Sequence, residues 1–96
     1  MELRRVVITG LGTINPLGNS VEEYFTNLNK GVSGAGPITR FDASLFKTRF
    51  ACEVKDFNPA AFGIDRKEAR KMDRFSQYAC AAADQAVADA NLLENE

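Results

Sequence analysis

The pattern of hydrophobic positions begins with a short run that is apolar on both faces. Residues 6–9, Val-Val-Ile-Thr, form a continuous β-branched run, and the Gly-Leu-Gly stretch of residues 10–12 follows directly. A run without alternation suits a strand that is buried on both sides, as the central strands of parallel sheets are. We therefore predict a central strand at residues 6–9 and a loop at residues 15–19, where Pro16 and Gly18 interrupt regular structure.

A helix is predicted to follow this loop. Ser20 and Glu23 have the spacing of a capping box, in which the serine would cap the helix and the glutamate would reach back to the Ser20 amide. Lys30 and Gly31 mark the end of the helical pattern. Its apolar face would be formed by Val21, Tyr24, Phe25 and Leu28.

The middle of the chain carries weaker signals. Residues 31–36 are rich in Gly and Ser and are predicted to be a loop, whereas residues 38–47 follow no single period. Residues 48–54 alternate well enough to predict a strand. Asn58-Pro59 predicts a turn or a helix start, because proline is well tolerated in a first turn. One face of the predicted strand would carry Phe50, Cys52 and Val54.

The strongest helical pattern lies in the C-terminal third. Asp65, with Glu68 three residues later, is one candidate N-cap. Asp73 is a second candidate, which would start a separate helix after a short first one, and the pattern leaves both open. Asn91 is predicted to be the left-handed residue after the helix. Helical spacing relates Met72, Phe75, Ala79, Ala82, Ala83, Ala86, Val87 and Ala90.

These elements are too few for the fold that they indicate. A sheet buried on both faces needs more than two strands and more covering helices than the chain offers. Residues 79–83 are small all round, which permits other backbones to approach closely. We therefore expect an α/β fold of which residues 1–96 are only a part, without an internal domain boundary.

Composition and charge narrow the classes of function. The formal net charge of -1 indicates neither a nucleic acid nor an anionic membrane as a partner. The N-terminal apolar run is too short for a signal peptide, and no run approaches the length of a membrane span, so the cytoplasm is the expected location. The chain contains no histidine, which excludes Cys-His and Ser-His catalytic pairs within it and the usual histidine metal ligands.

Two features invite a chemical interpretation that the residues do not favour. Gly10 and Gly12 resemble the start of a dinucleotide fingerprint, but Asn15 replaces the third glycine and no helix begins directly after the turn. We therefore assign these glycines to turn geometry and close packing. Cys52 and Cys80 match no zinc or disulfide pattern and are expected to be small buried residues without a catalytic role.

The most informative feature is a group of cations. Lys67, Arg70, Lys71 and Arg74 are spaced i, i+3, i+4 and i+7, so a continuous helix would place them on one face, with Arg66 at the same end. Such a face would either dock an acidic partner or be a solvated face whose charges are offset by nearby carboxylates. On charge and spacing alone, the solvated face is the more common outcome.

Several stretches, taken together and in order, resemble one known family over essentially the whole chain. They are residues 6–12, 15–18, 38–42, 49–51, 66–75 and 77–79. The family that they resemble is that of the β-ketoacyl-acyl-carrier-protein synthases, and the basic segment resembles its type II fatty-acid group. Type I condensing enzymes, polyketide ketosynthases and chain-length factors share the same opening.

This resemblance implies a thiolase-like layered α/β fold, in which two similar halves each contain a five-stranded mixed sheet, and a homodimer. It implies a decarboxylating condensation of an acyl group with malonyl-acyl-carrier protein in fatty-acid elongation, with no cofactor. The nucleophilic cysteine and two histidines of the family lie in later sequence, so no catalytic, cofactor or metal residue is expected here. Lys67, Arg70 and Lys71 match family positions that contact the acyl carrier protein, and Arg66 and Arg74 are auxiliaries on charge alone.

Two other classes of function remain as alternatives. The absence of histidine also suits a non-catalytic module or subunit that docks an acidic partner such as acyl carrier protein. The broken glycine pattern at residues 10–15 is the only support for a small nucleotide-binding protein.

Overall fold

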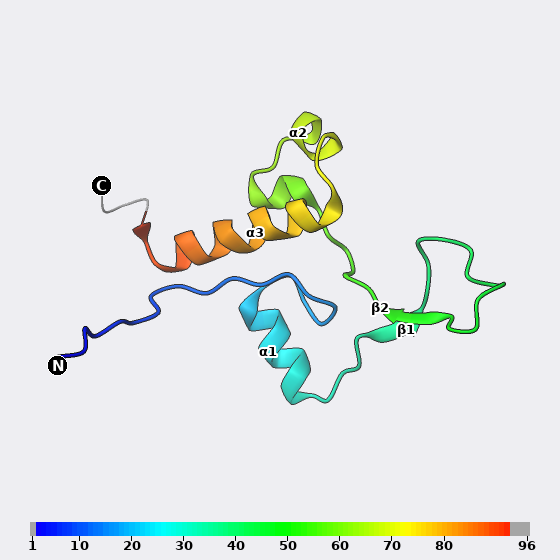
Figure 1. Ribbon diagram of the computed structural model, residues 1–96, viewed down its shortest axis with the longest axis horizontal. Coiled ribbons are helices and arrows are strands. Elements are labelled where there is room, and N and C mark those ends of the chain that lie inside the picture. The colour runs from blue at the N-terminus through cyan, green and yellow to red at the C-terminus, as the bar shows by residue number, and fades with distance from the viewer. Residues whose placement is uncertain (1, 93–96) are drawn as a thin grey trace.

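The computed structural model describes residues 2–92 and places six short elements along an elongated body (Figure 1). Its Cα radius of gyration is 16.9 Å, whereas a compact domain of 100 residues would have about 13 Å. The elements are α1 (Val21–Asn29), β1 (Ala35–Pro37), β2 (Phe50–Cys52), the 3₁₀ helix η1 (Pro59–Phe62), α2 (Arg66–Arg70) and α3 (Arg74–Asp89).

The N-terminal run does not form the predicted strand. Residues 6–9 belong to no strand, and Val6 and Ile8 are 87% and 81% exposed. Within residues 2–92 the only sheet is the pair of β1 and β2, so no strand lies beside this run. The prediction of a buried central strand is therefore wrong for this structure, because a strand requires a partner that the described residues do not supply.

The glycines after this run pack against α3, as predicted. Figure 1 shows the N-terminal segment running between α3 and α1. A Cβ atom added to Gly10 or Gly12 would overlap the carbonyl oxygens of Ala86 or Ala82, so only glycine allows this close approach. The Thr13 N–H donates to the Gln85 side-chain oxygen at 3.1 Å, which ties the same segment to α3.

Helix α1 begins and ends where the sequence predicts. The Glu23 N–H donates to the Ser20 hydroxyl at 3.1 Å, which confirms Ser20 as the N-cap. The Glu23 carboxylate accepts from the Asn19 N–H at 3.5 Å rather than from the Ser20 amide, which corrects that half of the capping box. Gly31 has a φ of 72°, and the Val32 N–H donates to the Asn27 carbonyl at 3.0 Å, so the helix ends in a Schellman motif.

The β1–β2 pair corrects the prediction for residues 31–36. These residues were predicted to be a loop, yet Ala35–Pro37 forms β1, antiparallel to β2 with Gly36 opposite Ala51. Gly and Pro disfavour strands by propensity, but pairing with β2 decides the conformation here. Strand β2 lies inside the predicted range 48–54 and is shorter than predicted.

The C-terminal third contains two helices, which decides between the alternatives left open above. Helix α2 follows Asp65 and ends at Arg70, and α3 begins after Asp73. Upstream, the Asn58 side chain accepts from the Ala60 N–H at 3.2 Å, so Asn58-Pro59 starts η1, which packs on α3. Asn91 has a φ of 57°, which confirms its predicted left-handed conformation.

Few side chains are buried in the described part of the chain. The buried apolar residues are Ala43, Ile64 and Ala81. Cys52 and Cys80 are both exposed, so the prediction that they are buried is wrong. Cys80 lies on a face of α3 that forms one wall of an open hollow beneath η1 and α2, and nothing in residues 2–92 fills that hollow. In this range, no helix has the length and apolar character needed to cross a membrane.

Candidate docking surface

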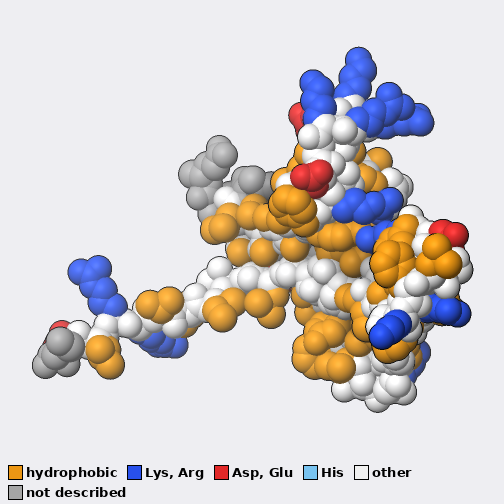
Figure 2. Space-filling view, turned by 45° about the vertical axis from the view of Figure 1, so that its right-hand side comes forward, with side chains coloured by type: hydrophobic (Ala, Val, Ile, Leu, Met, Phe, Trp, Pro, Cys, Tyr) orange, Lys and Arg blue, Asp and Glu red, His pale blue; other side chains and the backbone are white. Residues whose placement is uncertain are grey.

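Five cations gather where α2 meets the start of α3. Arg66, Lys67 and Arg70 lie on α2, Lys71 is its C-cap and Arg74 is the first residue of α3. All five residues are exposed, and Figure 2 shows Lys and Arg side chains projecting into solvent over this part of the molecule. We call this group of five residues the basic corner.

The basic corner is not the single helical face that the spacing predicts. The N–H groups of Lys71 and Met72 donate to carbonyls three residues back, at 3.0 and 3.2 Å, so the α-helix tightens and ends there. Asp73 is extended, with a ψ of 157°, and the chain changes direction before Arg74. The continuous-helix premise is therefore wrong, and Arg74 joins the group from a second helix.

The electrostatics of the basic corner differ from those of a salt-bridged helix face. Residues 65–74 carry five cations and three carboxylates, the latter from Asp65, Glu68 and Asp73. In the described range, no side chain of the basic corner forms an ion pair with these carboxylates. Within residues 2–92 the five charges are therefore not paired with these carboxylates, and the choice between a docking face and a solvated face stays a prediction.

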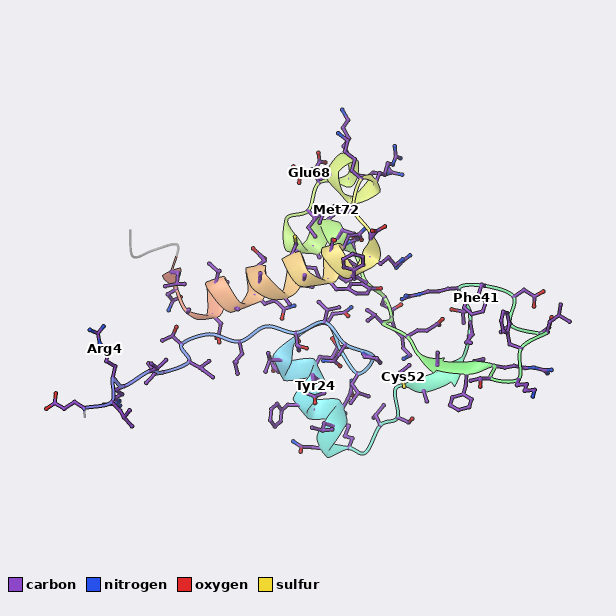
Figure 3. The ribbon with its side chains drawn as sticks, in the orientation of Figure 1. Arg4, Tyr24, Phe41, Cys52, Glu68 and Met72 are labelled. Atoms are coloured by element: carbon purple, nitrogen blue, oxygen red, sulfur yellow. The ribbon has the colours of Figure 1, made fainter. Side chains whose placement is uncertain are left out.

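A side chain of α3 holds α2 in place from below. The Gln77 Nε2 donates to the Ala69 carbonyl at 2.9 Å and to the Met72 carbonyl at 3.2 Å. Met72 is half-buried and lies between α2 and α3 (Figure 3). Ile64, which immediately precedes the α2 N-cap, is buried. The sequence reasoning noted Gln77 only as part of a resembling motif and assigned it no role, because its partners are backbone atoms that no side-chain pattern reveals.

No catalytic constellation accompanies the basic corner in the described residues. No group of three or more Cys, Asp or Glu side chains there is arranged to hold a metal ion. Cys52 lies on β2, away from α2 (Figure 3), and Cys80 lies in the middle of α3. The two thiols therefore belong to separate regions.

Two carboxyl groups with a lowered pKa also lie away from the basic corner. The Ser44 N–H donates a hydrogen bond to the Asp42 carboxylate, and this bond lowers the pKa of Asp42. The Thr39 hydroxyl, which donates to Glu53 at 2.8 Å, lowers the pKa of Glu53. Asp42 belongs to the segment between β1 and β2 and Glu53 directly follows β2, so these bonds order the region around the strand pair.

The glycine segment leaves no site for a nucleotide. The positions at Gly10 and Gly12 where a pyrophosphate would approach the backbone are filled by α3. The segment continues without helix as far as Ser20, so no helix begins directly after these glycines, as a dinucleotide fingerprint requires. The nucleotide-binding alternative therefore has no structural support.

Comparison with known proteins defines the family. The profile described as "Beta-ketoacyl synthase, N-terminal domain" matches residues 3–96. The chain thus belongs to the β-ketoacyl synthase family. Its fold is the N-terminal part of the thiolase-like ketosynthase fold, as predicted.

Individual relatives agree with this assignment. The chain is 53% identical over its full length to "3-oxoacyl-[acyl-carrier-protein] synthase 2" of Synechocystis sp., and 54% identical to the protein of that name from Coxiella burnetii. A solved structure, "The ishigamide ketosynthase/chain length factor", matches 96% of the chain at 51% identity with a TM-score of 0.85. The chain spans 23% of the length of each of these three proteins.

Proposed function

We propose that this chain is the N-terminal part of a β-ketoacyl-acyl-carrier-protein synthase II. The enzyme would be an acyltransferase that condenses an acyl group with malonyl-acyl-carrier protein, with loss of carbon dioxide, in fatty-acid elongation. The proposal rests on 53% identity over the whole chain to a relative that bears this name. By the same resemblance, the complete enzyme would be a cytoplasmic homodimer.

In this proposal, residues 1–96 contribute scaffold and a docking surface but no catalytic residue. The chain contains no histidine, so the two histidines of the condensing reaction must lie elsewhere in the enzyme. Cys52 and Cys80 lie in separate regions, and the chain contains no histidine that would activate either of them as a nucleophile. The 96-residue chain alone is therefore expected to be inactive.

The docking role would fall to the basic corner. The observation that carries it is that five exposed cations share one corner of the molecule without an ion pair among the described residues. An acidic carrier protein would be attracted to such a corner over a distance comparable to the Debye length, and the contacts would fix its orientation. Lys67, Arg70 and Lys71 are the principal contacts by resemblance, with Arg66 and Arg74 as auxiliaries.

Charge reversal tests this role. The triple substitution Lys67→Glu, Arg70→Glu and Lys71→Glu, in the natural polypeptide that contains these residues, should raise the Kd for acyl carrier protein by about tenfold or more at low salt. Isothermal titration calorimetry would measure the Kd, and the effect should shrink as salt rises. Arg4→Glu, Arg5→Glu and Lys47→Glu make the same change in net charge at exposed positions outside the basic corner. If the two sets of substitutions weaken carrier-protein binding equally, or if neither set weakens it, the docking surface is rejected.

A non-catalytic module or subunit that docks acyl carrier protein is the second candidate. The absence of histidine favours it, because no condensation can be completed by these residues alone. A condensation assay on the natural polypeptide, with its intact mass measured in parallel, separates the two. Product formation by that polypeptide alone supports the synthase, whereas carrier binding without product supports the module.

A further inference from the structure

The helix that carries most of the basic corner is too short to be stable by itself. Helix α2 has five residues, and isolated helices need roughly 12–15 residues to form in water. Neither Asp65 nor Asp73 makes a side-chain capping bond, so local capping does not hold the chain here. The conformation of α2 therefore depends on contacts with the rest of the molecule.

Gln77 supplies the polar part of those contacts. Its amide nitrogen donates to the carbonyls of Ala69 and Met72, at 2.9 and 3.2 Å, both at the C-terminal end of α2. The last carbonyls of a helix lack the next turn's N–H groups as partners. The Ala69 carbonyl already accepts from the Met72 N–H at 3.2 Å and gains a second bond from Gln77, whereas within residues 2–92 the bond to the Met72 carbonyl comes from Gln77 alone. Among the described residues, these are the only side-chain hydrogen bonds that reach residues 65–73. The bonded carbonyls flank Arg70 and Lys71, so the Gln77 amide holds the backbone that carries these two cations.

We propose that Gln77 is a positioning residue for docking of the acyl carrier protein, an inference that rests on the docking role proposed above. Gln77 is half-buried, and in this proposal it acts through α2 rather than by contact with the partner. It fixes the C-terminal end of α2 before binding, so that Arg70 and Lys71 are held in the arrangement that an acidic partner meets. Without Gln77, this end would be ordered only on binding, and the cost of ordering would lower the affinity.

The test replaces Gln77 without changing any charge. Gln77→Met removes both donors and keeps the length of the side chain, and the variant is made in the natural polypeptide that contains these residues. The matched control is Gln85→Met, the same substitution two turns later on α3, where the amide bonds Thr13 and Asn19 and does not touch α2. We expect Gln77→Met to raise the Kd for holo-acyl-carrier protein about fivefold, equivalent to the loss of about one hydrogen bond. Gln85→Met should leave that Kd within about twofold.

Three further readouts separate positioning from general loss of structure. The Gln77→Met effect on Kd should fade near 1 M salt, where the Debye length is about 3 Å, because the variant acts through the placement of charges. The KM for a carrier-protein thioester should rise while the KM for the coenzyme A thioester stays unchanged. Amide hydrogen exchange at residues 69–72 should accelerate. If Gln77→Met does not fold, Gln77→Asn, which reaches at most one carbonyl, should raise the Kd about twofold.

The outcomes distinguish this inference from the function on which it rests. If the triple charge reversal leaves carrier binding unchanged, both proposals fail. If charge reversal weakens binding and the Gln77 variants do not, the positioning role is wrong and the docking surface stands. Equal weakening by Gln77→Met and Gln85→Met would also overturn the positioning role, because it would show a general effect of destabilising α3.

Discussion

The two halves of the N-terminal segment, residues 3–9 and residues 10–18, differ in burial although neither contains a helix. In residues 3–9 the large apolar side chains are exposed, with Leu3 at 88%, and no described residue packs over them. In residues 10–18, Gly10 and Gly12 lie against α3, and most residues are half-buried or buried. The same lack of helix thus accompanies opposite degrees of burial.

The difference shows which interactions a short segment can complete within the chain. Glycine at positions 10 and 12 lets backbone touch backbone, and α3 presents alanines at the contact, so packing needs only these two elements. Gln85 and Asp89 then accept from the backbone N–H groups of Thr13 and Leu11, which would otherwise lack partners. The β-branched residues before Gly10 require a neighbouring strand and a covering layer, and no described residue provides them.

The largest effect should come from filling the contact between Gly12 and α3. In the 96-residue chain, Gly12→Ala should lower the free energy of unfolding by roughly 3 kcal/mol, because the new Cβ overlaps the Ala82 carbonyl and forces the segment away. Urea unfolding followed by circular dichroism would measure it. Gly36→Ala is the matched control, with nothing within 4 Å of the added Cβ, and should change stability by less than about 0.5 kcal/mol. Equal effects would show that Gly12 does not lie against α3.

A smaller effect should come from the hydrogen bonds that flank this contact. Gln85→Met should lower the free energy of unfolding by about 1.5 kcal/mol, since it leaves the part-buried Thr13 N–H and Asn19 carbonyl without the Gln85 amide as a partner. Asp89→Ala should cost about 0.5 kcal/mol, because the Leu11 N–H that it releases is exposed and water replaces the carboxylate. The same unfolding experiment compares them. If Asp89→Ala lowered the free energy of unfolding more than Gln85→Met, the Leu11 N–H would be more buried than the Thr13 N–H, contrary to the burial described above.

The features that the sequence predicted correctly are those decided by neighbouring residues or by side-chain size. Ser20 as a cap, Gly31 as a helix end and Asn91 as a left-handed residue depend on local backbone requirements. The packing role of Gly10 and Gly12 followed from their lack of a side chain. The five cations of the basic corner are exposed, as both the docking face and the solvated face require, so their docking role stays a prediction.

The features that the sequence missed depend on partners distant in the chain. Strand β1 forms at residues of low strand propensity because β2 lies beside it. The sequence could not decide whether the helix is interrupted between α2 and α3, because Asp65 and Asp73 were equally good N-cap candidates. The hydrogen bonds from Gln77 to α2 could not be predicted either, because their acceptors are backbone carbonyls. Cys52 and Cys80 are exposed because no described residue packs over them. The small apolar residues around them in the sequence do not reveal whether such a packing partner is present.

The smallest effect is expected in the exposed half of the N-terminal segment. Ile8→Ala should change the unfolding free energy of the 96-residue chain by less than about 0.5 kcal/mol, because Ile8 is 81% exposed and leaves no cavity. Ile64→Ala removes the same atoms from a side chain that is only 7% exposed and should cost about 3 kcal/mol. If Ile8→Ala costs more than about 1 kcal/mol, residues 3–9 pack against something in solution, such as a second copy of the chain. If the urea midpoint depended on protein concentration, the packing partner would be a second copy of the chain. The contrast in burial between the two halves would then hold only for the chain without that partner.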